Sequence, residues 1–153
     1  MANMTDQTRV DWLLQALYTA SGTATFTPGT GGGSALAITP PYHLRLMTTA
    51  GSNTSNGTEA TSSNCPGYTQ YGASMGSSAF GTPSAGQQSN SNAVTWNATG
   101  TWTSIPSIEI WDASTAPGLR WLQGALTSSI TGVVNGDTVQ FAAASVTLNA
   151  SAW

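Results

Sequence analysis

The chain has 153 residues, and charged residues make up 6% of it, against roughly 25% in typical soluble domains. It carries three basic residues, six acids and a formal net charge of −3. Nucleic-acid binders neutralise phosphates with many lysines and arginines, so this composition argues against such a partner. A single cysteine, Cys65, excludes an intramolecular disulfide framework and a multi-cysteine zinc site.

The first expected element is a short α-helix that begins at Thr5 or Asp6 and ends near Thr19. Its apolar residues follow the spacing of one helix face: Val10, Leu13, Leu14, Leu17 and Tyr18. No apolar run approaches the roughly 20 residues needed to span a bilayer, so we expect no membrane partner.

Residues 20–41 change in character and are rich in glycine and proline. They contain the run Gly31, Gly32 and Gly33, which is typical of an arm or linker. This composition divides the chain into a helix with a Gly-rich arm, residues 1–41, and a β-domain, residues 42–153.

Residues 42–49 predict the first strand of that domain, because their side chains alternate between two faces. One face carries Tyr42, Leu44 and Leu46, and the other carries His43, Arg45 and Met47. This is the pattern of a half-buried strand. The following residues, 50–92, are dominated by Gly, Ser, Asn and Thr, and a loop of this length is typical of a binding surface.

Short extended pieces are expected within that loop, at residues 68–71 and 75–80. Further strands are predicted at 93–97, 101–103, 107–112, 119–126 and 138–148. Asn135, Gly136 and Asp137 predict a tight turn. A change in alternation within the last strand indicates a bulge or break near Ala143. The expected fold is mainly β, an antiparallel β-sandwich (jelly-roll-like) with a short N-terminal α-helix.

The order and spacing of several motifs resemble those of a family of short tailed-bacteriophage virion proteins. The motifs are Gly57-Thr58-Glu59, Gly67-Tyr68, Ala93-Val94-Thr95-Trp96, Ile108-Glu109-Ile110-Trp111-Asp112-Ala113, Gly124-Ala125-Leu126 and Gly136-Asp137-Thr138-Val139-Gln140-Phe141. The likeness covers residues 42–150. Members are described as tail-fibre-like, minor tail or head decoration proteins, so the resemblance implies a β-sandwich displayed on a virus particle.

Residues that carry chemistry are few, and we expect neither an enzyme nor a cofactor or metal site. The glycine run lacks the Lys-Ser/Thr of a phosphate-binding loop. His43 has no second histidine with which to share a metal. The acids Glu59, Glu109, Asp112 and Asp137 are spread along the chain and show no Asp-x-Asp spacing for calcium. Asp137 is expected to serve the Asn-Gly turn.

Four tryptophans recur in the strand-rich half: Trp96, Trp102, Trp111 and Trp121. Indole rings can fill a core or a subunit contact, or they can form a platform for sugars. Core or subunit contact is the preferred interpretation, and carbohydrate contact is the alternative.

The sequence therefore favours a capsid decoration (cement) protein that binds the outer surface of the major capsid protein lattice. The alternative is a tail or head fibre, or minor tail protein, which contacts the host surface and its glycans. An excess of large apolar residues predicts association of copies into a homotrimer. The candidate partner-contact residues are Trp12, Gly31, Gly32, Gly33, Tyr68, Tyr71 and Trp153.

Overall fold

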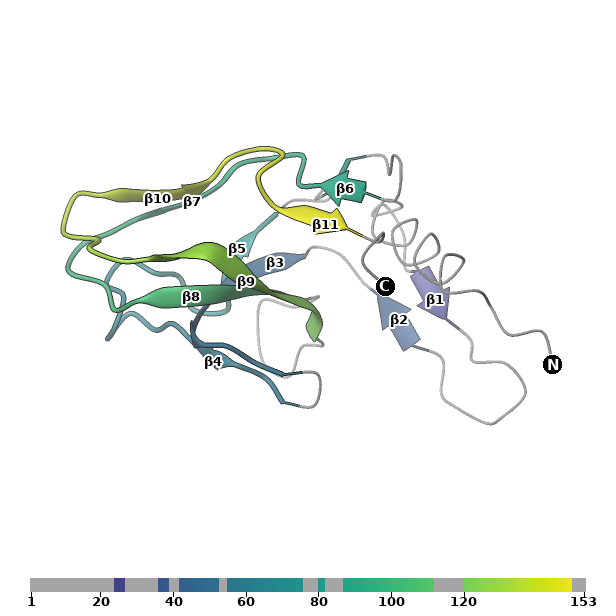
Figure 1. Ribbon diagram of the computed structural model, residues 1–153, viewed down its shortest axis with the longest axis horizontal. Coiled ribbons are helices and arrows are strands. Elements are labelled where there is room, and N and C mark those ends of the chain that lie inside the picture. Colours follow the sequence, from purple (N-terminus) through teal and green to yellow (C-terminus); the bar gives the residue numbers. More distant parts are fainter. Residues whose placement is uncertain are drawn as a thin grey trace.

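The computed structural model describes residues 24–26, 36–38, 42–52, 55–75, 80–81, 87–111 and 120–149 (Figure 1). The expected helix lies outside these residues. Within the range predicted to be an arm, β1 (Ala24–Phe26) pairs antiparallel with β2 (Leu36–Ile38). The glycines between these two strands, Gly31 to Gly33, lie outside the described residues.

A five-stranded antiparallel sheet forms the main layer. Its strands are β3 (His43–Thr49), β4 (Thr58–Glu59), β5 (Ala73–Ser74), β8 (Ile105–Trp111) and β9 (Arg120–Ile130). They follow the order β4-β3-β8-β9, and β5 also pairs with β3. β3 is thus central, and β9 lies at an edge.

Two shorter antiparallel pairs accompany this sheet. β7 (Val94–Asn97) pairs with β10 (Thr138–Phe141), and β6 (Gln87–Ser89) pairs with β11 (Thr147–Asn149). In Figure 1 the β7–β10 pair runs alongside the main sheet. The described part of the chain is therefore mainly β and antiparallel. These pairings do not establish the jelly-roll-like sandwich expected from the sequence.

One hydrophobic core joins the sheet to the β7–β10 pair. Leu44 and Ile110 of the sheet belong to the same buried cluster as Trp96 and Val139 of the pair. Trp102 also belongs to it, and its indole Nε1 donates to the carbonyl of Pro66 at 2.8 Å. The core interpretation is confirmed for these two tryptophans. Trp111 is buried, and Trp121 packs partly buried against the same cluster.

The expectation of a half-buried first strand was wrong, because β3 is buried on both faces from His43 to Met47. Leu44 and Leu46 face the core as predicted. The opposite face, which carries Arg45, is covered by the side chains of Tyr71 and Trp111. Alternation of residue types identified the strand but gave no sign of this second cover.

Two predicted extended segments are irregular. Residues 101–103 form no strand, because their backbone bonds to other loops: Trp102 N donates to Val133 O, and Thr103 N donates to Asn64 O. Residues 68–71 form no strand: a turn at residues 70 and 71 is closed by a hydrogen bond from Gly72 N to Thr69 O, and Tyr71 has a φ of 66°. The predicted Asn-Gly-Asp turn is confirmed, with a φ of 92° at Gly136 and a hydrogen bond from Val134 N to Asp137 Oδ2.

The edge strand β9 is longer than predicted and reaches Ile130. Its pairing with β8 shifts register between Ile105 and Ser107, which face Ile130 and Ala125. Pro106 lies at this shift. Proline has no N–H to donate to a ladder, so it is tolerated in strands at irregularities of this kind.

Among the described residues, no helix is long and apolar enough to cross a membrane.

The predicted break near Ala143 is confirmed, since β10 ends at Phe141 and β11 begins at Thr147. Ala144, within the break, has a φ of 62°. Asn90 holds the connection together from inside. Its Nδ2 donates to the carbonyls of Asn92 and Ala142, and its Oδ1 accepts from the N–H of Val146.

We expect Asn90→Ala to destabilise the fold by about 3 kcal/mol, because it leaves buried backbone groups without partners. Urea unfolding measures the change. Asn97→Ala is the matched control, since Asn97 is exposed, and it should cost less than about 1 kcal/mol. Equal costs for both variants would contradict this role of Asn90.

Candidate functional site

Four of the five charged side chains in the described residues gather on one face of the main sheet. Arg45 pairs with Glu59, with Nη1 and Oε2 3.3 Å apart, and Arg120 pairs with Glu109, with Nη1 and Oε1 3.0 Å apart. Strand register explains the meeting, because Arg45 of β3 lies directly opposite Glu109 of β8. We call these four residues the charge cluster.

Glu109 is the most buried member, with 1% of its side chain exposed. Its Oε1 accepts from Arg120 and, at 2.9 Å, from the backbone N–H of Gly57. Its Oε2 accepts from the indole Nε1 of Trp111 at 3.0 Å. A buried carboxylate is tolerated only when it is paired and hydrogen-bonded, and here both oxygens are satisfied.

Arg45 is held by aromatic rings as well as by Glu59. Its guanidinium carbon lies 4.1 Å from the centre of the Trp111 ring and 5.2 Å from that of Tyr71. Both distances are within the range of cation–π attraction. Tyr71, a candidate partner-contact residue, is half-buried and covers the Arg45 guanidinium. Its contact with a partner stays a prediction.

Tyr68, the other described candidate for a partner contact, is 4% exposed. Its hydroxyl donates to Glu59 Oε1 at 2.8 Å and accepts from Leu46 N at 3.2 Å. Burial is the largest cause, and the negative charge of Glu59 the second, of a raised pKa for Tyr68, so the hydroxyl keeps its proton. Its ring stacks with Trp96, with centroids 5.9 Å apart. Tyr68 therefore ties the charge cluster to the core.

Two further titratable groups are kept neutral by their surroundings. The pKa of His43 is lowered mainly by burial and secondly by the positive charge of Arg45. Burial also raises the pKa of the Cys65 thiol, which is free and lies in the core. A thiol held protonated is a poor nucleophile. Among the described residues, no group of three or more His, Cys, Asp or Glu could hold a metal ion.

The charge cluster also fastens the loop between β3 and β4. Arg120 donates to the carbonyls of Ser52 and Ser55, which form a two-residue bridge. A side chain at Gly51 would meet Arg120 and Glu109 at 2.5 Å, so this close approach needs glycine. The buried charges thereby position an exposed loop.

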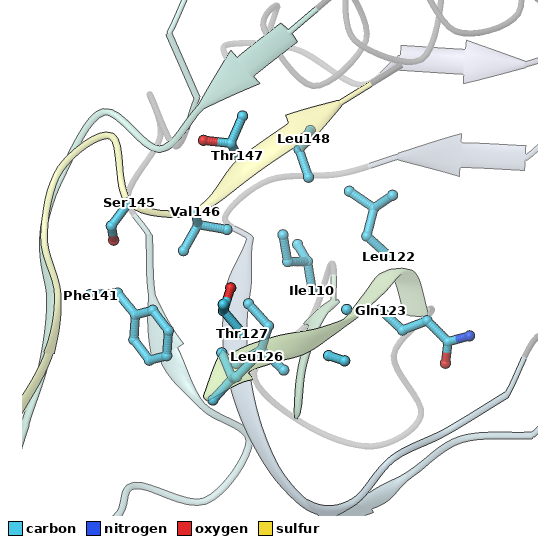
Figure 2. A pocket seen from close by; sticks show the side chains of 13 residues that line it. Ile110, Leu122, Gln123, Leu126, Thr127, Phe141, Ser145, Val146, Thr147 and Leu148 are labelled. Atoms are coloured by element: carbon cyan, nitrogen blue, oxygen red, sulfur yellow. The ribbon is translucent and has the colours of Figure 1, made fainter. Parts of the chain in front are cut away.

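A shallow groove lies on the other side of β9, between that strand and the segment from β10 to β11. It consists of two adjoining hollows of about 340 and 480 Å³. Figure 2 shows Leu122 and Leu126 of β9 facing Phe141, Val146 and Leu148, with Ile110 between them. We call this feature the β9 groove. Every residue that lines it is uncharged except Asp137.

The remaining candidate contact residues, Trp12, Gly31, Gly32, Gly33 and Trp153, lie outside the described residues. Sequence reasoning missed the charge cluster and the β9 groove. The available signal was an arginine and a glutamate within two predicted strands, residues 42–49 and 107–112, in a chain that has few of either. The register that places Arg45 opposite Glu109 is seen only in the structure.

The model of the family described as "Podophage GP4 fiber I protein gp80" matches residues 29–149. This confirms the resemblance to virion proteins of short-tailed phages and favours a fibre over a capsid decoration. No curated protein matches the chain.

We expect Glu109→Gln to destabilise the fold by about 3 kcal/mol, because Arg120 loses the opposite charge in a buried place. Amides of residues 51–57 should then exchange with solvent faster than in the wild type. Thermal unfolding and hydrogen exchange measure both effects. Asp137→Asn, which removes an exposed carboxylate, is the matched control and should change neither by much. Unchanged exchange in the loop would contradict its attachment to Glu109.

Proposed function

The chain belongs to the podophage GP4 fiber I protein gp80 family, and from that premise we propose that it is a subunit of a tail fibre that contacts the host surface. Its role is structural and adhesive, without catalysis. The alternative of a capsid decoration protein takes second place.

The family match carries this proposal, because it spans most of the chain and all strands from β2 to β11. The charge cluster and the β9 groove both lie inside the matched residues. The features described above thus belong to the part of the chain that resembles fibre proteins.

The distribution of charge supports the same role. Of the five charged side chains in the described residues, four belong to the charge cluster, and the fifth, that of Asp137, is exposed. The exposed positions of β9 carry Ala, Thr, Ser, Gly and Gln. Hydroxyl and amide groups suit contact with neutral surfaces such as glycans, whose binding does not require ion pairing.

Weak surface charge also suits close packing of identical subunits, because repulsion between copies stays small. Identical subunits pack closely both in a capsid lattice and in a fibre, so weak surface charge does not discriminate between the two roles. The family match favours the fibre role. We propose that copies of the chain associate as a homotrimer in the fibre, the oligomer expected from the sequence.

Counting copies per virion tests the proposal. Quantitative mass spectrometry against the major capsid protein should give roughly a few tens of copies per virion or fewer. A tail component has such a low copy number, whereas a protein that covers the capsid lattice is present in far more copies. Antibody-gold labelling of intact particles should mark the tail. Hundreds of copies, with label spread over the capsid, would overturn the fibre in favour of decoration.

A further inference from the structure

Gly124, in the edge strand β9, has no evident reason to be glycine within its own subunit. Among the described residues, a Cβ built there meets nothing within 4 Å, and the backbone of Gly124 is outside the left-handed region. Gly132 and Gly136 also face open space, but they have positive φ values of 72° and 92°. A glycine within a strand weakens it, and such a position often marks a bulge, a bend, or the close approach of another backbone or a ligand. Gly124 pairs regularly with Ile108, between the two register shifts of β9, so a bulge does not account for it.

The strand that holds Gly124 lies at an edge of the main sheet. Among the described strands, β9 pairs with β8 alone. After Arg120 it carries no charged residue and no proline, and Gly124, Ala125 and Thr127 are exposed. Natural proteins protect edge strands with charges, prolines, bulges or covering segments. From Trp121 onward β9 lacks the first two of these, and its register shifts lie outside the regularly paired residues 122–125.

The β9 groove adds an apolar wall beside this edge. Leu122, Leu126, Phe141 and Leu148 are partly buried hydrophobic residues, and Figure 2 shows them around one opening. Gly124 lines the same opening. A strand laid along β9 would therefore gain backbone hydrogen bonds on one side and apolar contact on the other.

We propose that the β9 edge and its groove are the surface on which a second copy of this chain docks, through a strand added to the main sheet. The chemistry of the surface fits its own copy. Hydroxyls and backbone groups both donate and accept, so a surface made of them is complementary to itself. Contacts between identical subunits can bring like charges together, and β9 has none from Trp121 to Ile130.

This docking rests on the proposed function only in that a fibre is built of repeated subunits. Pairing of β9 with β9 gives a two-fold contact and an even number of copies. Pairing of β9 with a different edge of the neighbour gives a ring, such as the proposed trimer. Both arrangements use the same surface of β9.

Gly124→Val tests the docking. Valine suits a strand and should leave the thermal unfolding temperature of the subunit unchanged or raise it, while its side chain blocks close approach of a neighbour. Sedimentation velocity of purified protein at roughly 10–100 µM should show association of the wild type, weakened about tenfold or more in Gly124→Val. Thr101→Val, which places the same side chain at an exposed position off the groove, should associate like the wild type.

A second pair of variants guards against a local effect of valine. Ala125→Lys adds a charge to the exposed edge and should also weaken association, whereas Thr101→Lys should not. A wild type that stays monomeric, or lysine and valine variants that associate fully, would overturn the docking. If the purified protein is monomeric but antibody-gold marks the phage tail, the docking is wrong and the fibre proposal stands. If the protein associates through β9 but antibody-gold marks the capsid, the docking stands and the fibre proposal is wrong.

Discussion

The buried carboxylate of Glu109 organises one face of the main sheet. A charge that is 1% exposed must be paired and hydrogen-bonded, or the sheet around it could not form. Glu109 meets this need with partners from three places: Arg120 at the start of β9, Gly57 in the loop before β4, and Trp111 on its own strand. Satisfying one charge thus fixes an edge strand and a loop together.

The same constraint shapes the exterior. Because four of the five charged side chains of the described residues lie in the charge cluster, their surface carries mainly hydroxyls, amides and small residues, and Asp137 is its exposed charge. Such a surface gains little from long-range attraction and must bind through close contact over an area. A fibre subunit offers that situation, because its neighbours are held near one another in the particle. Low surface charge is compatible with the fibre family that the chain matches.

The sequence predicted what alternation of residue types encodes. It located β3, β7 and β8 closely, and the break between β10 and β11, since a change of parity marks it directly. It failed where pairing is non-local. Glu109 and Gly57 are 52 residues apart, and nothing near either residue announces the contact. The irregular path around Trp102 arises from bonds to distant loops in the same way. Gly124 could be interpreted only once the space around it was known.

A double-mutant cycle on Glu109 and Arg120 tests whether this buried pair holds the sheet together. Urea unfolding of Glu109→Gln, Arg120→Met and the double variant gives their coupling free energy. We expect the two changes to be strongly non-additive, with a coupling of about 2 kcal/mol or more, because each single change leaves the other member of the pair without its partner. Costs that simply add, with a coupling near zero, would show that the pair behaves as an ordinary surface ion pair and that the fold does not depend on it.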